Sequence, residues 1–286
     1  MSYNEPVWAR VWARHYAGQL GAEHCLVLDH GSDDGSADGL GVPVRRLERS
    51  ALDDAWRAVV VAEEVRELLR RYDAVIHTDV DELLVADPAY YSGLAGFAAM
   101  VATPVVTAIG LDLHHLPDEE AALDVAREGR AFEAGGRRIG AQREWVRFSA
   151  AMCKPVLVRR PVTWSPGFHS CDAELVLDRL YLVHMRYADL GAGLRRLGRT
   201  RRQAVVDPAT CAHQRVPDAE FEGMMRAIAG LPREIGVLDP FSAPLVEWLD
   251  RLRASRAVRE REVYKLDLGL AGDVLWRLPL GMRELI

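Results

Sequence analysis

The stretch Ala74-Val-Ile-His-Thr-Asp-Val-Asp-Glu-Leu-Leu84 places three carboxylates directly after a short apolar run. Residues 74–76 are too few for a helix of their own, so the run predicts a buried strand. Alternate residues of an extended chain point to the same side. Asp79 and Asp81 are therefore expected to face one point at the carboxyl end of that strand, which is where open α/β sheets bind their ligands.

Two neighbouring carboxylates repel each other unless a cation or a proton lies between them. The pattern therefore predicts a divalent metal ion that binds phosphate, or else a solvated acidic turn after the strand. Glu82, the third carboxylate, is expected to support the loop.

The composition is that of an ordinary soluble globular protein, with 49% hydrophobic and 27% charged residues. A length of 286 residues allows one large α/β domain or two smaller ones. The net charge of −6 does not indicate a broad basic surface for nucleic acid. The cysteines form no Cys-x-x-Cys pair, which argues against a structural zinc site. Neither a signal peptide nor an apolar run of about 18 residues is found, so we expect no membrane span and a cytoplasmic protein.

Apolar periodicity predicts an alternation of helices and strands over the first part of the chain. The predicted elements are a helix over 6–20, a strand over 25–29, a helix over 50–72, a strand over 74–79, a helix over 89–101 and a strand over 105–113. This order predicts a mostly parallel sheet flanked by helices. Asp29 and Asp112 follow two of these strands, in the same kind of position as Asp79.

The second half of the chain has a weaker pattern. Residues 117–150 are polar and rich in Gly and Arg, which predicts either a loop that closes over a substrate or an irregular surface excursion. Short strands are expected over 154–158 and 180–185, with a turn between them. From residue 188 onward the pattern is mainly helical, over 188–204, 218–230 and 243–264. We therefore expect a first domain over 1–187 and a helical carboxyl-terminal extension over 188–286.

Six short motifs share a family pattern and together span residues 4–187. They are Asn4-Glu5, the loop Asp29–Ser36, the segment Thr78–Glu82, Lys154-Pro155, Gly167–His169 and Leu182–His184. In combination they resemble the family 2-like glycosyltransferases with the GT-A fold, in the bacterial branch that begins with an Asn-Glu motif. The resemblance implies a GT-A-like, Rossmann-like sheet and transfer of a sugar from a nucleotide-diphosphate donor to a glycan, lipid or small-molecule acceptor.

The resemblance also implies a donor site. Asn4, Glu5 and Asp29 would contact the nucleotide, and the Asp-x-Asp segment would bind Mn²⁺ or Mg²⁺. Asp81 would be a direct metal ligand, whereas Asp79 would contact the ribose or a metal-bound water. A hard cation held by carboxylate oxygens neutralises the charge of a departing nucleoside diphosphate. His184 would be a third metal ligand, and the alternative is a histidine that serves only the core.

The remaining assignments are less specific. Arg143 and Lys154 would contact the diphosphate, or else are surface charges. His169 would face the acceptor or the donor phosphate, or else is an exposed loop residue. An inverting transfer needs a carboxylate that takes the proton of the acceptor hydroxyl. We assign that role to Asp112, and the other candidates are Glu144, Asp172 and Glu174.

One departure from the family pattern concerns the start. The family has a strand before Asn-Glu, whereas only Met1–Tyr3 precede Asn4 here. Either the start is truncated or a strand edge is left open, and an open edge invites self-association.

The carboxyl-terminal pattern over 245–266 predicts a helix with one Arg-rich face. Such a face either lies on an anionic membrane surface or is a solvated face whose Arg residues pair with acids. Peripheral membrane contact is therefore one expectation for this protein.

Two other functions remain open. One is a nucleotidyltransferase with a similar fold, although the Gly-rich basic loop that it needs after the first strand is missing. The other is an inactive protein of the same fold that binds nucleotide-sugars or acts as a scaffold.

Overall fold

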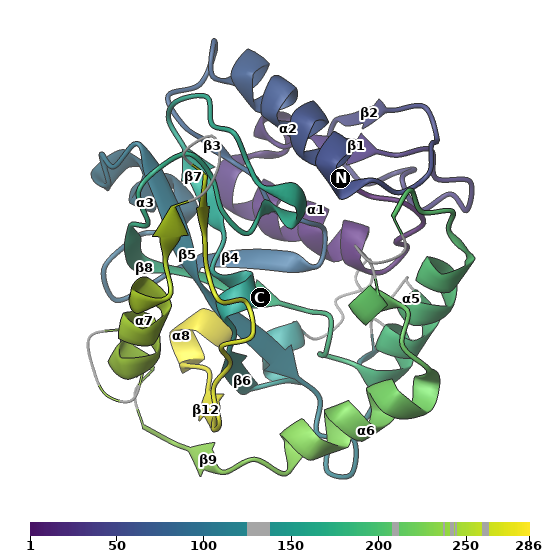
Figure 1. The fold of residues 1–286 in the computed structure, drawn as a ribbon, viewed down its shortest axis with the longest axis vertical. Coiled ribbons are helices and arrows are strands. Elements are labelled where there is room, and N and C mark those ends of the chain that lie inside the picture. The colour runs from purple at the N-terminus through teal and green to yellow at the C-terminus, as the bar shows by residue number, and fades with distance from the viewer. Residues whose placement is uncertain (125–137, 208–211, 237, 241–242, 244, 259–262) are drawn as a thin grey trace.

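A computed structural model describes the chain except for residues 125–137, 208–211, 237, 241–242, 244 and 259–262. It is an α/β fold in which helices flank a mixed sheet (Figure 1). The described helices are α1 (Trp8–Leu20), α2 (Asp54–Leu68), α3 (Leu94–Met100), α5 (Leu190–Arg202), α6 (Asp218–Ala229), α7 (Leu245–Ala254) and α8 (Leu280–Arg283).

The described strands form one large sheet and two small ones. They are β1 (Val27–Asp29), β2 (Val44–Arg46), β3 (Val75–Ile76), β4 (Glu82–Ala86), β5 (Val105–His114), β6 (Trp145–Phe148), β7 (Pro155–Val158), β8 (Leu177–His184), β9 (Arg233–Glu234), β10 (Ala257–Val258), β11 (Tyr264–Lys265) and β12 (Leu275–Arg277). The large sheet runs in the order β3-β7-β5-β6-β12-β9, with β8 also paired to β5 and β4 paired to β8. β1 and β2 form a separate parallel pair.

The expectation of a mostly parallel sheet is wrong. In the large sheet, β3–β7, β7–β5, β5–β6, β6–β12 and β4–β8 are antiparallel, whereas β5–β8 and β12–β9 are parallel. The alternation of strands and helices misled the prediction because β1 lies in a separate pair with β2, and β3 pairs antiparallel with β7 from later in the chain. Beyond β3 the neighbours are mostly antiparallel, and such pairs need no long crossover connection.

The core centres on β5, whose ten residues are all buried. A strand covered on both faces reads as a near-continuous apolar run, which is why 105–113 was predictable as a strand. Asp112, near the carboxyl end of β5, lies opposite His184, at the carboxyl end of β8, in the register of the two strands. The sheet thereby carries buried charged groups to one edge of the core.

Most predicted elements are present with shifted ends. The helix predicted over 50–72 is α2, and Asp53 caps it by accepting hydrogen bonds from the N–H groups of Ala55 and Trp56. The predicted strand over 74–79 is short, because the acidic segment forms a turn that leads directly into β4.

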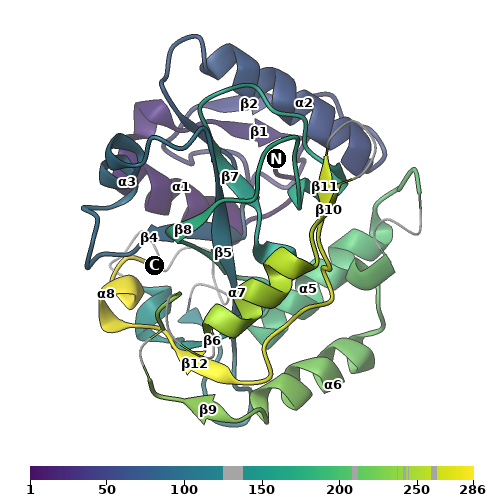
Figure 2. The same cartoon turned by 60° about the vertical axis from the view of Figure 1, so that its left-hand side comes forward.

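The carboxyl-terminal region is less helical than predicted. The helix predicted over 243–264 is α7, which ends at Ala254, and β12 returns to the large sheet beside β6. Figure 2 shows α5 and α6 adjacent to each other and β12 below α7. Arg259 and Arg261 of the predicted Arg-rich face, and residues 125–137 of the predicted closing loop, lie outside the described residues. Among the helices that are described, none has the length and apolar character to cross a membrane.

Candidate functional site

The site begins with a buried histidine between two carboxylates. β8 ends at His184, whose Nδ1 lies 2.7 Å from Oδ1 of Asp112 on β5. Its Nε2 lies 3.1 Å from Oδ2 of Asp81, in the turn before β4. All three residues are buried. The strand register explains this arrangement, since β8 is the neighbour of both β5 and β4.

These contacts determine the protonation of the three groups. Burial alone would lower the pKa of His184, but its hydrogen bonds to Asp112 and Asp81 outweigh burial and raise that pKa to about 9. Burial opposes ionisation of Asp81, yet Arg196 and His184 hold its pKa well below the usual range. The pKa of Asp112 is also lowered, because the hydrogen bond from His184 outweighs burial. At neutral pH His184 is therefore an imidazolium between two carboxylates.

A second cation reaches the same carboxylate from α5. Arg196 donates a hydrogen bond from Nη1 to Oδ2 of Asp81, and its Nε lies 3.1 Å from Oε1 of Glu5. Arg199, one turn later, donates to Oε2 of Glu5 at 2.7 Å. Asp189 caps α5 by accepting a hydrogen bond from the N–H of Ala192. Sequence reasoning missed both arginines, because no motif links α5 to the acidic turn.

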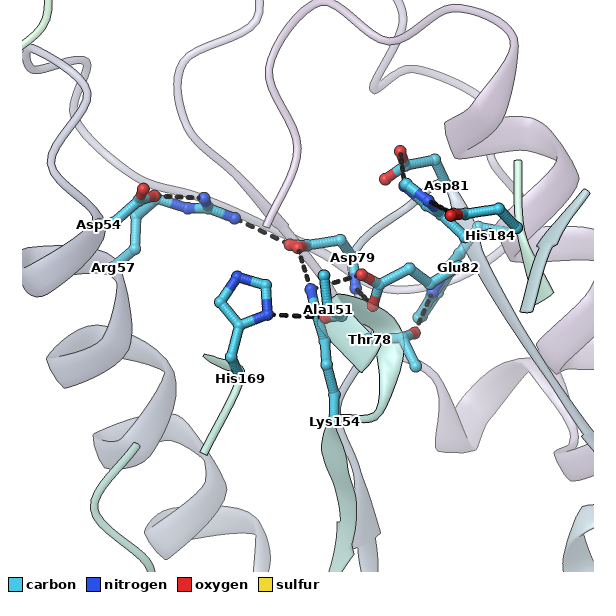
Figure 3. A network of polar contacts seen from close by, with 12 residues as sticks. Asp54, Arg57, Thr78, Asp79, Asp81, Glu82, Ala151, Lys154, His169 and His184 are labelled. Atoms are coloured by element: carbon cyan, nitrogen blue, oxygen red, sulfur yellow. Dashed lines mark hydrogen bonds and ion pairs between the residues drawn. The ribbon is translucent and has the colours of Figure 1, made fainter. Parts of the chain in front are cut away.

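Asp79 belongs to a neighbouring network, drawn in Figure 3. Nη2 of Arg57 donates to Oδ1 of Asp79 at 2.8 Å, and Nζ of Lys154 lies 3.4 Å from Oδ2. Lys154 also lies 2.5 Å from Oε1 of Glu82. The other oxygen of Glu82 accepts a hydrogen bond from the N–H of Asp79 at 2.9 Å. Glu82 therefore holds the turn in shape, as expected from the sequence.

The negative charge of Asp79 is balanced by the two cations beside it, Arg57 and Lys154. Burial disfavours its ionised form, but Arg57 and Lys154 together hold its pKa well below the usual range. Burial likewise works against the charged form of Lys154, and Glu82 and Asp79 overcome it and raise the pKa of that ammonium. This turn is thus a compact set of ion pairs, in which Lys154 and Glu82 are buried and Asp79 and Arg57 are half-buried, and not a solvated acidic turn.

A small polar pocket of about 110 Å³ opens beside both networks. The charged side chains that line it are Glu5, Arg49, Arg57, Asp79, Asp81 and Arg196. Asp112 does not line the pocket and reaches it only through His184 and Asp81. The pocket therefore presents three guanidinium groups and three carboxylates to a ligand.

The residues around Asp29 lie at the rim of this pocket. Asp29 is fully buried and accepts hydrogen bonds from the N–H of Ser32, with Nη1 of Arg46 at 3.6 Å. Its neighbour His30 lines the pocket. Asn4 has a positive φ of 50° and exchanges side-chain and backbone hydrogen bonds with Asp33. Of the expected donor contacts, Glu5 and Asp79 line the pocket, whereas Asp29 and Asn4 shape the loop beside it.

Arg143 and His169 do not line the polar pocket. The buried guanidinium of Arg143 donates to the carbonyls of Ala188, Gln142 and Ala121. It therefore ties chain segments together and does not lie in the pocket, so the diphosphate contact expected of Arg143 does not fit the structure. Nδ1 of His169 lies 2.7 Å from the carbonyl of Ala151, a contact drawn in Figure 3.

A divalent metal ion does not fit the residues as they are arranged. In the described part of the chain, no three His, Cys, Asp or Glu side chains form a set that could hold a metal ion. Asp81 and His184 do meet, but both nitrogens of His184 are engaged by carboxylates, and Asp81 is also paired with Arg196. A metal-ligating histidine must instead be neutral and offer a free lone pair.

Comparison with known proteins adds no assignment, since no family model, no curated protein and no solved structure matches this chain.

Proposed function

We propose that this protein is a glycosyltransferase that moves a sugar from a nucleotide-diphosphate donor to a hydroxyl acceptor. One observation carries this proposal: the paired carboxylates Asp79 and Asp81 lie beside a pocket lined by Arg49, Arg57 and Arg196. A diphosphate needs several positive charges within hydrogen-bonding reach, and guanidinium groups match phosphate oxygens in pairs.

The chemistry follows from charge development during the transfer. As the glycosidic bond breaks, negative charge grows on the leaving nucleoside diphosphate. Fixed cations in a site of low dielectric constant stabilise that charge strongly. Arg57 and Arg196 are held in place by Asp79 and Asp81, so they are oriented before the donor binds. Glu5 orients Arg196 from its other side.

Asp112 is the base that we propose for the acceptor hydroxyl, which would therefore bind outside the polar pocket, on the side of His184 away from Asp81. His184 holds it ionised and fixes its orientation through the 2.7 Å hydrogen bond. A carboxylate that remains ionised accepts a proton only as the new glycosidic bond forms, which suits an inverting transfer. No step in this scheme passes through a metal ion.

Ligand binding gives the first test. We expect a nucleoside diphosphate to raise the melting temperature in EDTA as well as in Mn²⁺, because binding to the native state alone stabilises it. Arg196→Gln should abolish this shift, whereas Arg202→Gln, at an exposed position of the same helix, should preserve it. If a shift appears only with Mn²⁺, the proposed cationic pocket is wrong and the metal site predicted from the sequence is favoured.

Turnover gives the second test. Asp112→Asn should reduce donor-dependent sugar transfer by about 100-fold or more and leave the nucleotide-induced thermal shift unchanged. Nucleotide binding without transfer or hydrolysis of any nucleotide-sugar would instead identify an inactive binding protein.

A further inference from the structure

A row of three charged residues crosses the large sheet on the side of His184 away from Asp81. His184 of β8 lies opposite Asp112 of β5, and Asp112 lies opposite Arg147 of β6. Residues that lie opposite one another in neighbouring strands point to the same face of the sheet. The three side chains therefore share one face, with a positive charge on either side of the carboxylate.

Arg147 brings a positive charge that no carboxylate of the described chain neutralises. Asp112, its neighbour in the row, is paired with His184 instead, at 2.7 Å. Nε of Arg147 donates to the carbonyl of Gly272 at 2.6 Å, and its two Nη groups have no protein partner among the described residues. Such a planar pair of donors matches a phosphate or a carboxylate, which it holds by two parallel hydrogen bonds.

His114 is a second polar group with unmet hydrogen bonds on this face. It lies two residues beyond Asp112 in β5, so the two side chains point to the same side. It is 1% exposed, and within the described structure neither of its ring nitrogens has a hydrogen-bond partner. Burial lowers its pKa to about 4, so at pH 7 the neutral ring offers one donor and one acceptor. Buried polar side chains are rarely left without a partner, and a ligand group would satisfy this one.

Arg147 and His114 are diagonal neighbours across the β5–β6 pair. His114 lies opposite Trp145, two residues before Arg147. Diagonal positions on one face are about 7–8 Å apart, so a single phosphate or carboxylate can accept hydrogen bonds from both side chains. Tyr187 stacks on the imidazole, with 5.3 Å between the ring centroids. Trp145, Arg147 and Tyr187 are half-buried, so this end of the face borders solvent.

We propose that this face binds the acceptor, and that the acceptor carries a phosphate or a carboxylate held between Arg147 and His114. This inference rests on the proposed transferase function, because the same face carries Asp112, the base. An anion at this position places a nearby hydroxyl of the acceptor beside Asp112, and Arg147 offsets the repulsion between the two negative charges. The nitrogens of His114 are reached when the half-buried Tyr187 ring moves aside.

Thermal shift of the full chain tests the anion site. We expect glucose 6-phosphate, well above its Kd, to raise the melting temperature by about 2 °C or more. Methyl glucoside at the same ionic strength should leave it unchanged. Arg147→Gln should abolish the shift, Arg147→Lys should keep part of it because the charge remains, and Arg202→Gln should keep all of it. A shift that persists in Arg147→Gln would overturn the proposal.

Two further probes distinguish the sources of the anion. Glucuronic acid presents a carboxylate on a sugar, and hexyl phosphate, with hexanol as its neutral control, presents a phosphate on an alkyl chain. A shift with hexyl phosphate alone assigns the site to a lipid headgroup, and a shift with either sugar anion assigns it to a soluble or glycan acceptor. No shift with any of the three anions would overturn the proposal.

A substitution at His114 separates ligand binding from a structural role. His114→Phe keeps a ring to stack on Tyr187 and removes both nitrogens. We expect it to raise the melting temperature of the unliganded chain by about 2 °C or more, because an unsatisfied buried polar group is lost. It should also reduce the shift given by the anion to half or less. A lower melting temperature with an unchanged shift would mean that His114 serves only the core, and the proposed site would be wrong.

The nucleoside diphosphate shift keeps this test apart from that of the proposed function. That shift reports on the polar pocket, so it should be the same in Arg147→Gln as in the unaltered chain. Its absence from the unaltered chain would contradict the proposed donor site. Its presence without any anion shift would contradict the acceptor assignment alone.

Discussion

His184 allows two buried carboxylates to remain ionised close to each other. It lies within hydrogen-bonding distance of both Asp81 and Asp112. Two carboxylates that share a site without a cation would force one of them to take up a proton. The histidine therefore controls the charge of the site, and its protonation connects the site to the stability of the fold.

This connection predicts a loss of stability at alkaline pH. The pKa of His184 is raised to about 9 in the folded state, above its ordinary value of 6.5. The stabilisation is therefore complete below about pH 6.5 and is lost as the pH rises through 9. We expect the free energy of unfolding, measured in urea, to fall by up to about 3 kcal/mol over this window.

Two comparisons make that measurement specific. His184→Gln should remove most of the change over the same window. The other strongly shifted histidines do not interfere, since burial lowers the pKa of His30 and His114 to about 4 and that of His77 to about 3. An unchanged slope in His184→Gln would assign the pH dependence to another group.

Lys154 gives a second prediction at the residue scale. Its ammonium is buried between Glu82 and Asp79. Lys154→Met should destabilise the fold by about 3–5 kcal/mol, because it leaves buried carboxylates without their partner. Lys265→Met, at an exposed position, should have almost no effect in the same urea titration. Adding Glu82→Gln to Lys154→Met should restore part of the loss, and no recovery would mean that packing dominates.

At the scale of elements, β5, β8 and β4 place the site. Parallel pairing of β5 with β8 puts Asp112 beside His184, and antiparallel pairing of β8 with β4 brings the acidic turn next to the same histidine. A shift of one residue in either register would turn these side chains to the other face of the sheet. The site is therefore as sensitive to strand register as to the identity of its residues.

A substitution at Gly110 tests this register, because Gly110 lies in β5 and is not one of the site residues. An added Cβ there would collide with backbone atoms of Met152 and Ser149. Gly110→Ala should therefore destabilise the protein by about 1–3 kcal/mol or more, as overpacked core positions do. Gly223→Ala in α6 has open space around the added Cβ and should stabilise by about 0.5–1 kcal/mol. Thermal unfolding measures both variants. Equal effects of Gly110→Ala and Gly223→Ala would contradict the close packing of Gly110 against Met152 and Ser149.

At the scale of the whole molecule, the carboxyl-terminal region completes the first part of the chain. Arg196 of α5 pairs with Asp81, and Trp276 of β12 pairs with Val146 of β6. A boundary at residue 187 would therefore cut through both the charge network and the large sheet. The two predicted domains share these contacts across that boundary.

We predict that a fragment of residues 1–187 does not fold as an independent unit. It would leave Asp81 without Arg196 and would expose the apolar face that the buried residues Leu275 and Leu278 cover. Near-ultraviolet circular dichroism and urea titration, with the full chain as control, should show no cooperative transition. A cooperative transition like that of the full chain would restore the two-domain description.

The sequence by itself determined the local features. Apolar runs and periodicity predicted α1, α2 and β5, because helix and strand periods depend on residues close together in the chain. Position after a strand also selected Asp79 and Asp81, and the family resemblance added His184. Asp81 and His184 do meet, at 3.1 Å, whereas Asp79 pairs with Arg57 and Lys154.

Only the tertiary structure decided the sheet direction and the partners of these groups. Antiparallel pairing, the reach of Arg196 from α5 and the engagement of Arg143 by backbone carbonyls depend on contacts between distant segments. Such contacts leave no local pattern, because register and packing are set by the fold as a whole. For the same reason, the balance of charge at Asp81 was not visible in the sequence, where the acidic segment indicated a metal ion and the fold supplies Arg196 and His184.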